Sequence, residues 1–286
     1  MLKQIYKRLN FTTFLQITLI LQLFLLFAPL AQAAKIAIVI DDVGYRVKED
    51  REILSLPKEV SVAIIPDAPY ATERARESYA QKRDILIHLP MEPKSRQFIE
   101  KNSIKIGDGE EKIRKLIGDS RGQVPHAIGL NNHTGSGATA DVATMQPLMK
   151  VLKEQSLFFL DSKTIGNSIA AKTAREFGIP TLERNIFLDD SDELADVKKQ
   201  FSQSIQYARR NGVAVVIGHP RKNTIAILKQ HLATLPADIE LIGIGTLWRN
   251  EKVVPEKPLI MLFEQEPALS SIPPYESIPL LRGIPR

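Results

Sequence analysis

The sequence predicts an α/β fold built as a (β/α) barrel. Short runs rich in Val, Ile and Leu recur along the chain, and most are continuously apolar, which is typical of strands buried on both faces of a parallel sheet. Longer segments with helical spacing separate these runs, as in repeated βα units. The 286-residue chain is long enough for such a barrel, which usually needs about 250 residues. An open doubly wound sheet is the alternative, and we favour the barrel.

The strands are predicted from eight apolar runs. In chain order they are Ile36–Ile40, Val60–Ile65, Ile85–Leu89, Ala127–Leu130, Leu157–Leu160, Thr181–Leu188, Val213–Ile217 and Ile239–Ile244.

Helices are predicted between these strands from apolar residues that recur at intervals of three and four. Residues 141–154 show this spacing most clearly, at Val142, Met145, Leu148, Met149 and Leu152. The other three are residues 169–177, 193–210 and 224–235. Gly178, Gly212 and Pro236 lie just past these three segments, as expected where helices end.

Residues 1–33 are a predicted signal peptide. Basic residues near the start precede an apolar run over residues 11–30, and Ala31-Gln32-Ala33 follows as a small-x-small cleavage pattern. An uncleaved anchor is the alternative, because about 20 apolar residues span a bilayer. Polar residues and Pro29 interrupt the run and favour cleavage. We therefore expect export to the periplasm or another extracytoplasmic compartment, with no membrane span after cleavage.

Composition excludes several classes of protein. The chain has no cysteine, so disulfide scaffolds, thiolate zinc sites, iron–sulfur clusters and cysteine nucleophiles are excluded. The net charge of +5 includes three basic residues of the leader, and the remainder carries 35 basic and 33 acidic residues. Because that balance is nearly even and aromatic residues are only 6%, we expect no nucleic-acid partner.

The domain organisation follows from a change in composition near the C-terminus. Residues 34–250 hold the predicted barrel domain, whereas residues 251–286 contain seven prolines. This proline density prevents a helix and favours an extended tail. The tail is expected either to bind a partner protein of the cell envelope or to be a poorly ordered terminus.

Polar residues end most of the predicted strands. Because active sites of parallel βα folds form at the carboxyl ends of strands, we expect these residues to share one rim. In chain order they are Asp41-Asp42, His88, His133, Asp161, Asp189-Asp190 and His219. Two of the five histidines, His126 and His231, lie elsewhere in the sequence.

Two imidazoles and a carboxylate without thiolates suit Zn²⁺ or another borderline divalent metal. A catalytic site of this kind adds a carboxylate that takes a proton from water and an imidazole that protonates a leaving amine.

Each residue also has an ordinary structural interpretation. Asp41-Asp42 can cap a helix, a lone histidine can be a hydrogen-bonded structural residue, and Asp161 can cap the next helix. Residues 189–192 can form a solvated turn, and His219-Pro220 a rigid one. The co-location of all of them favours a polar active site.

The sequence resembles the divergent polysaccharide deacetylase family, relatives of the NodB-type carbohydrate esterases. The resemblance covers residues 35–248 and rests on five segments: Ile38-Val-Ile-Asp-Asp-Val-Gly44, Ile87-His-Leu-Pro-Met-Glu92, Asn131-Asn-His-Thr-Gly135, Phe159-Leu-Asp-Ser162 and Val216-Ile-Gly-His-Pro220. It implies a distorted, NodB-like barrel of seven to eight strands, a bound divalent metal and a role in the periplasm or envelope.

The resemblance also implies roles for individual residues. Asp41 corresponds to the catalytic base and Asp42 to a metal ligand. NodB-type enzymes take two histidine ligands from one His-x-x-x-His segment, whereas here Gly137 or Glu92 stands where the second histidine would be. We therefore expect His88 and His133, from neighbouring strands, to replace that pair.

Two further residues complete the predicted site. His219 corresponds to the late histidine that acts as general acid, and Asp161 is expected to orient an imidazole. The Arg-Pro-Pro-Tyr-like motif of typical NodB enzymes is not evident.

These observations lead to one main hypothesis of function: a metal-dependent hydrolase that removes N-acetyl groups from an envelope polysaccharide. The alternative is a non-catalytic protein that binds a glycan or an envelope partner on a deacetylase-like barrel. A phosphoesterase is a third hypothesis, although a two-metal centre needs more carboxylates than cluster here.

Overall fold

The computed structural model describes residues 33–95 and 99–249. The predicted tail, 251–286, and the predicted signal peptide, apart from its last residue, lie outside the described residues. Both therefore stay predictions. Within the described part of the chain, no helix combines the length and the apolar character needed to cross a membrane.

Nine parallel strands form one sheet in the part of the chain that is described. They are β1 (Ala34–Val43), β2 (Ser61–Ile64), β3 (Ile85–Met91), β4 (Gly129–Thr134), β5 (Phe158–Asp161), β6 (Thr181–Glu183), β7 (Ile186–Phe187), β8 (Val213–Gly218) and β9 (Ile239–Ile242). The hydrogen-bonded order is β6-β5-β4-β3-β2-β1-β8-β7, and β9 pairs with the start of β1.

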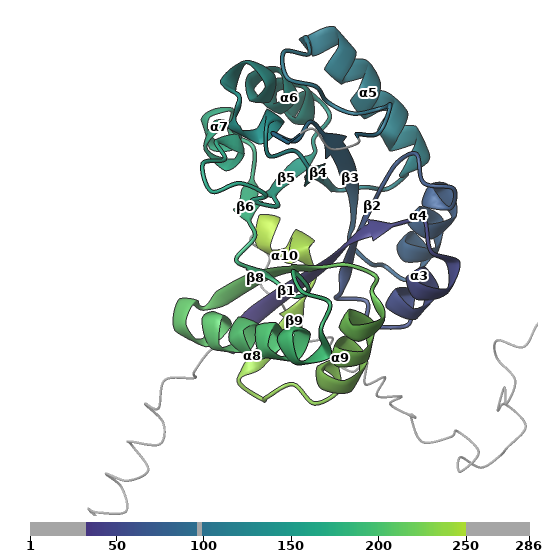
Figure 1. Ribbon diagram of the computed structural model, residues 1–286, viewed down its shortest axis with the longest axis vertical. Coiled ribbons are helices and arrows are strands. Elements are labelled where there is room, and N and C mark those ends of the chain that lie inside the picture. Colours follow the sequence, from purple (N-terminus) through teal and green to yellow (C-terminus); the bar gives the residue numbers. More distant parts are fainter. Residues whose placement is uncertain (1–32, 96–98, 250–286) are drawn as a thin grey trace, which may run out of the picture. The chain divides into compact units, whose positions relative to one another are not determined.

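The sheet curls until its two edge strands, β6 and β7, are joined by only Arg184 and Asn185 (Figure 1). The edges follow one another along the chain without pairing among the described residues. The eight strands of this path confirm the predicted α/β fold, a distorted barrel of seven to eight strands, and β9 adds a ninth strand beside β1.

Helices cover the outer side of the curled sheet (Figure 1). They are α3 (Val47–Leu54), α4 (Ala71–Ala80), α5 (Glu110–Gln123), α6 (Val142–Glu154), α7 (Ala170–Glu176), α8 (Leu194–Asn211) and α9 (Lys222–Leu232), with the 3-10 turn η2 (Ala138–Ala140) before α6. The last described helix, α10 (Ile244–Trp248), instead packs with residues inside the barrel.

The structure corrects two strand predictions. The single predicted strand over residues 181–188 is split into β6 and β7, because its first part pairs with β5 and its second with β8. The predicted strand over 127–130 begins at Gly129 and runs on to Thr134, because its polar end pairs with β3. A search for apolar runs stops where this strand becomes polar.

Alternating side chains divide the core into two clusters. On β1, Ile36, Ile38 and Ile40 pack in the cluster beneath the helices, whereas Ala37 and Val39 pack in the smaller cluster inside the barrel. The inner cluster also holds Trp248 of α10, whose indole N–H donates to the Phe159 carbonyl at 3.2 Å. Because successive side chains of a strand alternate between faces, this pattern fixes which later residues of each strand point into the barrel.

Candidate metal centre and adjoining acid–base groups

Polar side chains continue the inner face of the strands at their carboxyl ends. On β1, Asp41 follows the inward-facing Ala37 and Val39 at intervals of two. On β3, His88 follows Leu86 of the inner cluster in the same way. The apolar floor of the barrel is therefore capped by a layer of ionisable and amide groups.

Strand register completes this layer on β4. Asn131 of β4 lies opposite His88, and His133 lies two residues further along the same strand. His88 and Asn131 are buried, whereas His133 is partly exposed. The neighbouring strands β3 and β4 thus bring both imidazoles to one side of the barrel mouth.

Asp42 reaches the same place through an irregularity of β1. Its φ of 57° lies in the left-handed region, and the register between β1 and β2 shifts between Ile40 and Val43. A bulge of this kind re-aims a side chain, and Asp is among the few residues that tolerate such a backbone. Both acids of the Asp41-Asp42 pair can therefore face the mouth although they are consecutive.

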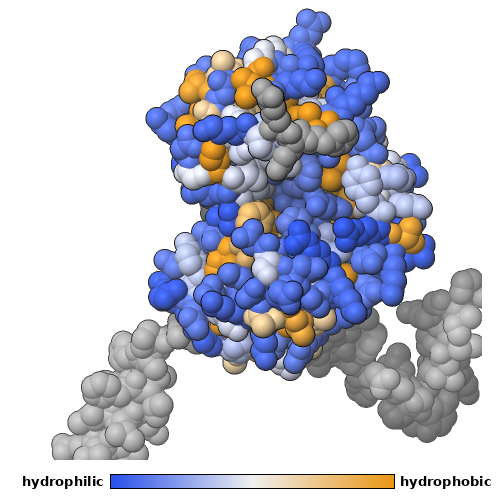
Figure 2. Space-filling model, in the orientation of Figure 1, coloured by the Kyte–Doolittle hydropathy of each residue, from blue (hydrophilic) through white to orange (hydrophobic). Residues whose placement is uncertain are grey.

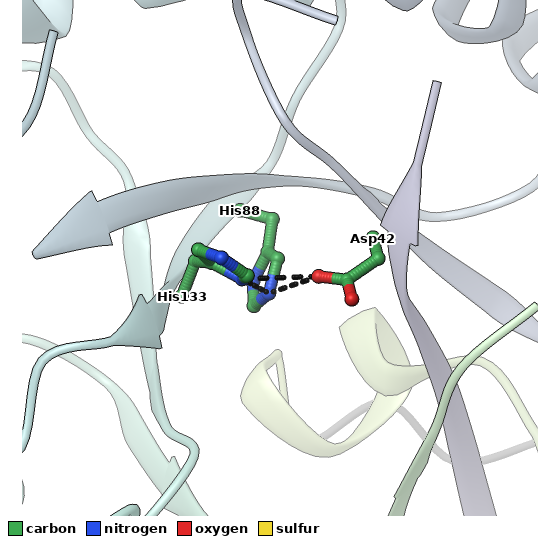
Figure 3. Close-up of side chains that lie close together, drawn as sticks. All are labelled: Asp42, His88 and His133. Atoms are coloured by element: carbon green, nitrogen blue, oxygen red, sulfur yellow. Dashed lines mark hydrogen bonds and ion pairs between the residues drawn. The ribbon is translucent and has the colours of Figure 1, made fainter. Parts of the chain in front are cut away.

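Three donor atoms converge from Asp42, His88 and His133 (Figure 3). His133 Nδ1 lies 3.0 Å from His88 Nε2 and 3.0 Å from Asp42 Oδ1, and His88 Nε2 lies 3.3 Å from Asp42 Oδ1. In a tetrahedral zinc site, ligand bonds of about 2.0–2.1 Å place donor atoms about 3.3 Å apart. The triangle therefore has the size of three corners of such a site.

The hydrogen bonding of Asp42 also supports a metal at the centre of the triangle. Asp42 Oδ1 is buried and has no hydrogen-bond partner among the described residues. A buried carboxylate oxygen without a partner is costly, and a cation between it and the two imidazole nitrogens satisfies all three atoms. The donor set fits a divalent metal, and Asp42, His88 and His133 are the residues that would hold it.

Neighbouring groups fix which nitrogen of His88 faces this point. The Asn131 amide NH₂ donates to Asp41 Oδ1 at 2.9 Å, so the amide oxygen faces His88 Nδ1 at 3.0 Å. Because an amide oxygen only accepts, Nδ1 carries the proton and Nε2 presents its lone pair to the centre.

On His133, the outer nitrogen Nε2 lies 3.5 Å from Glu100 Oε1, which leaves Nδ1 as the inner donor. The two histidines thus offer different ring nitrogens, and each has a partner on the far side of its ring.

The pKa shifts of Asp42 and His88 indicate that the centre favours positive charge. Burial raises the pKa of Asp42, but the His133 and His88 imidazoles outweigh it and bring that pKa well below its ordinary value. Burial lowers the pKa of His88, yet the nearby Asp41 and Asp42 charges raise it to about 8. The pocket therefore attracts positive charge, which either protons or a metal ion can supply.

Asp41 lies directly beside the three donors. Its Oδ2 is 3.6 Å from His88 Nε2, and burial raises the pKa of this carboxyl despite the opposing His88 and His219 charges. A carboxylate with a raised pKa is suited to accept a proton near neutral pH. The position fits the base predicted from the sequence.

His219 at the end of β8 is held by Asp189. The His219 Nδ1 proton is donated to Asp189 Oδ1 at 2.8 Å, and the His219 backbone N–H donates to Oδ2 at 2.7 Å. Burial lowers the pKa of His219, but the Asp189 bond and charge, with smaller contributions from Asp41 and Asp42, raise it overall. The imidazole is thereby favoured in its protonated form, as a general acid requires.

Asp161 does not have the predicted contact with an imidazole. Its carboxylate accepts from the Lys163 backbone N–H at 2.8 Å and the Ser168 hydroxyl at 2.7 Å, which makes it a turn-forming residue after β5. Asn131 orients His88 instead. The correction has a simple cause, because the carboxylate bonds to its own following loop before it can reach across the sheet.

Three residues of the site were given no role from the sequence: Asn131, Glu100 and Asp189. Asn131 stands two positions before His133 on one strand, and that spacing was the available signal for it. Asp189 belonged to an acidic run that resembles a solvated turn, yet it is fully buried. Glu100 lies in the loop between β3 and α5 and carries no local signal.

The other two histidines lie away from the centre, as predicted. His126 stacks on Tyr79 with ring centroids 3.6 Å apart, and His231 stacks on Phe201.

The face of the molecule shown in Figure 2 has a hollow, and the surface around this hollow is mainly hydrophilic.

Known proteins resemble this chain in both sequence and fold. A family model described as divergent polysaccharide deacetylase matches residues 38–248. An uncharacterized protein of Haemophilus influenzae is 54% identical over 253 residues, which cover 88% of this chain and 90% of that protein. The uncharacterized protein YibQ of Escherichia coli is 41% identical over 79% of this chain and 71% of its own length.

A solved structure of an uncharacterized Agrobacterium tumefaciens protein superposes with a TM-score of 0.71 at 21% identity. The superposition covers 76% of this chain and 89% of that one. This likeness supports the fold.

Proposed function

The chain belongs to the divergent polysaccharide deacetylase family, and we propose that it is an exported, metal-dependent hydrolase that removes N-acetyl groups from a cell-envelope polysaccharide. The observation that carries this proposal is the triangle of Asp42, His88 and His133 donor atoms, with a carboxylate and an imidazole beside it. Zinc is the metal that best suits two imidazoles and one carboxylate.

A metal bound by these residues would supply Lewis-acid polarisation of the acetamide carbonyl and a lowered pKa for water. The remaining chemistry belongs to the chain. Asp41 accepts the proton of the attacking water, and Asn131 keeps its carboxylate beside His88 by donating to Oδ1. The amide C–N bond then breaks as His219 donates its Nε2 proton to the departing nitrogen, giving a free amine and acetate.

Asp189 prepares His219 for that step. Its buried carboxylate holds Nδ1–H, so the other ring nitrogen is the one available to the leaving amine. The arrangement of acid, imidazole and substrate matches the orienting role of the carboxylate in a catalytic triad. Asp161 has no part in this mechanism.

Export and an envelope substrate are supported by the sequence of residues 1–33, with its basic start, apolar run and Ala31-Gln32-Ala33 pattern. A glycan is the substrate class that the family implies. A protein partner that binds the proline-rich tail is a further part of this proposal.

Acetate release tests the proposal. Zinc-loaded protein incubated with N-acetylated glycans is expected to release acetate, and Asp41→Asn is expected to lower the rate by about 10²- to 10⁴-fold while retaining zinc. The asparagine keeps an oxygen that accepts from Asn131, so the fold and the ligands stay in place. If zinc-loaded wild type binds glycans but releases no acetate, the chain is the non-catalytic glycan-binding protein instead.

A further inference from the structure

The loop that follows the proposed metal ligand Asp42 is tightly enclosed. Two residues after Asp42, Gly44 has a φ of 119°, and a Cβ atom there would lie only 2.7 Å from the Ala68 Cβ. The Gly44 carbonyl accepts from the Tyr70 backbone N–H at 3.0 Å. Asp42 itself has a left-handed backbone, with a φ of 57°. Because such conformations persist only where the surroundings impose them, neighbouring groups must fix this loop.

Asp50 of α3 is the side chain that binds this loop. The Gly44 and Arg46 backbone N–H groups both donate to Asp50 Oδ2, at 3.0 and 3.3 Å, and the carboxylate is fully buried. Gly44 is buried as well, so no water can take the place of the carboxylate at its N–H. The backbone that aims Asp42 and the backbone that Asp50 binds are therefore continuous.

Arg74 of α4 favours the charged form of that carboxylate. Its Nε lies 3.8 Å from Asp50 Oδ2, and both side chains are completely buried. Burial raises the pKa of Asp50 to about 6, although the Gly44 and Arg46 bonds and the Arg74 charge oppose the rise. The Arg74 guanidinium also lies over the Tyr70 ring, 5.8 Å from its centroid. The same arginine is thus beside both residues that bond to Gly44.

The ordinary interpretation of Asp50 is that it caps a helix. Arg46 is the N-cap residue of α3, and an acidic side chain near the helix start that accepts from the N-cap N–H stabilises the helix. Capping explains only one of the two bonds. The other comes from Gly44, which lies outside the helix, between the cap and Asp42.

We propose that Asp50, paired with Arg74, is a positioning residue for Asp42: by binding the backbone of residues 44–46 it aims Asp42 and thereby sets the affinity of the centre for zinc. Asp50 acts through the backbone and takes no part in the chemistry. This proposal rests on the metal centre of the proposed function, and it does not depend on whether acetate is released.

The zinc affinity of the full chain, measured by competition with a chelator in the absence of substrate, tests this proposal. Asp50→Asn removes the charge with almost no change of shape, and it is expected to lower the affinity by about 10- to 100-fold, as for other partners of metal ligands.

Asp84→Asn is the matched control for this measurement. Asp84 also accepts a backbone N–H, from Gly245 at 2.8 Å, and its carboxylate also lies 3.8 Å from an arginine, Arg249. It directly precedes β3, at the end of the strand away from the metal centre. The Asp84→Asn variant is therefore expected to keep the wild-type zinc affinity.

A second background shows whether the effect passes through Asp42. In Asp42→Ala the two histidines remain as ligands, and addition of Asp50→Asn is expected to cause no further loss of zinc affinity. A merely structural role of Asp50 would lower the affinity in both backgrounds.

Hydrogen exchange of the wild-type chain gives a test that needs no variant. If the loop sets the zinc affinity, zinc must stabilise the loop in return. On addition of zinc, exchange at the Gly44 and Arg46 amides is expected to slow by about tenfold more than exchange at the Gly245 amide. This measurement decides the matter if Asp50→Asn does not fold.

The outcomes separate this proposal from the proposed function. Unchanged zinc affinity in folded Asp50→Asn, an equal loss in the Asp42→Ala background, or Gly44 and Arg46 amides that zinc does not slow would each overturn it, even where wild type releases acetate. A loss of affinity that requires Asp42, in a chain whose wild type binds zinc but releases no acetate, supports the positioning role and contradicts the catalytic proposal. A wild-type chain that binds no zinc overturns both.

Discussion

Two groups of carboxylate and imidazole face the mouth of this barrel, and they are connected in opposite ways. On the β1, β3 and β4 side, Asp42, His88 and His133 turn three acceptor atoms toward one point, and the Asp42 oxygen has no hydrogen-bond partner among the described residues. On the β7 and β8 side, Asp189 is saturated by donors from His219 and Thr224. The donor atoms of the first group suit a cation, whereas the second group is complete with a proton.

The partner on the far side of each ring explains this difference. His88 donates to the neutral amide of Asn131, which fixes its tautomer without adding charge. His219 donates to the buried carboxylate of Asp189, whose charge favours the imidazolium. These partners suit the same side-chain type to bind a metal on one side and to donate a proton on the other.

Replacement of His133 by alanine has the largest expected effect, because it removes one of the three proposed metal ligands of the first group, here called the cation side. Zinc content of the purified, folded protein is expected to fall from about one ion per chain to nearly none, and acetate release is expected to cease. Metal analysis by mass spectrometry measures the first and an acetate assay the second. His126→Ala, at a histidine that stacks on Tyr79 outside the site, is the control. Stoichiometric zinc in folded His133→Ala contradicts the ligand assignment.

Replacement of Asp189 by asparagine tests only the second group, the pair of Asp189 and His219, here called the proton side. Turnover is expected to fall by about 10²- to 10⁴-fold, because the tautomer and charge of His219 are no longer held. Zinc content is expected to be unchanged.

The pH profile of Asp189→Asn gives a second readout. In the proposed mechanism His219 acts in its protonated form, so activity is expected to be lost as pH rises through its pKa. Without the Asp189 charge that pKa falls, and the alkaline decline in kcat is expected to move to lower pH. An unchanged alkaline limb would show that His219 is not the general acid.

The fold could be predicted well because it depends on repeated local patterns. Apolar runs with helical segments between them are enough to indicate parallel βα units, and the alternation of β1 already implies that Asp41 faces inward. The split of residues 181–188 was missed. The polar residues Glu183-Arg184-Asn185 interrupt the segment, but only the pairing of its two parts with β5 and β8 makes them separate strands.

The site was predictable where strand position decides and unpredictable where loops decide. Asp42 and His133 lie near the ends of β1 and β4, and His88 lies in the C-terminal part of β3, so their meeting follows from the common direction of those strands. Asp161 also ends a strand, but its bonds to Lys163 and Ser168 remove it from the site. Glu100 comes to His133 from a long loop, and no periodicity places a loop residue.

Replacement of Glu100 by glutamine has the smallest expected effect. It tests the partner of His133 on the cation side, as Asp189→Asn tests the partner of His219 on the proton side. Glu100 lies 3.5 Å from His133 and is 22% exposed, whereas Asp189 is 2.8 Å from His219 and fully buried. A looser and more hydrated partner orients its imidazole more weakly, so zinc affinity is expected to fall by about tenfold, at the lower end for partners of metal ligands. Competition with a chelator measures the affinity, and Glu183→Gln, at a carboxylate paired with Lys163, is the matched control.

The two sides are independent if Glu100→Gln lowers the affinity for zinc without moving the alkaline limb of the pH profile, while Asp189→Asn moves that limb without lowering the affinity for zinc. If either variant produces both effects, the two groups act as one coupled network, and the division into a cation side and a proton side is wrong.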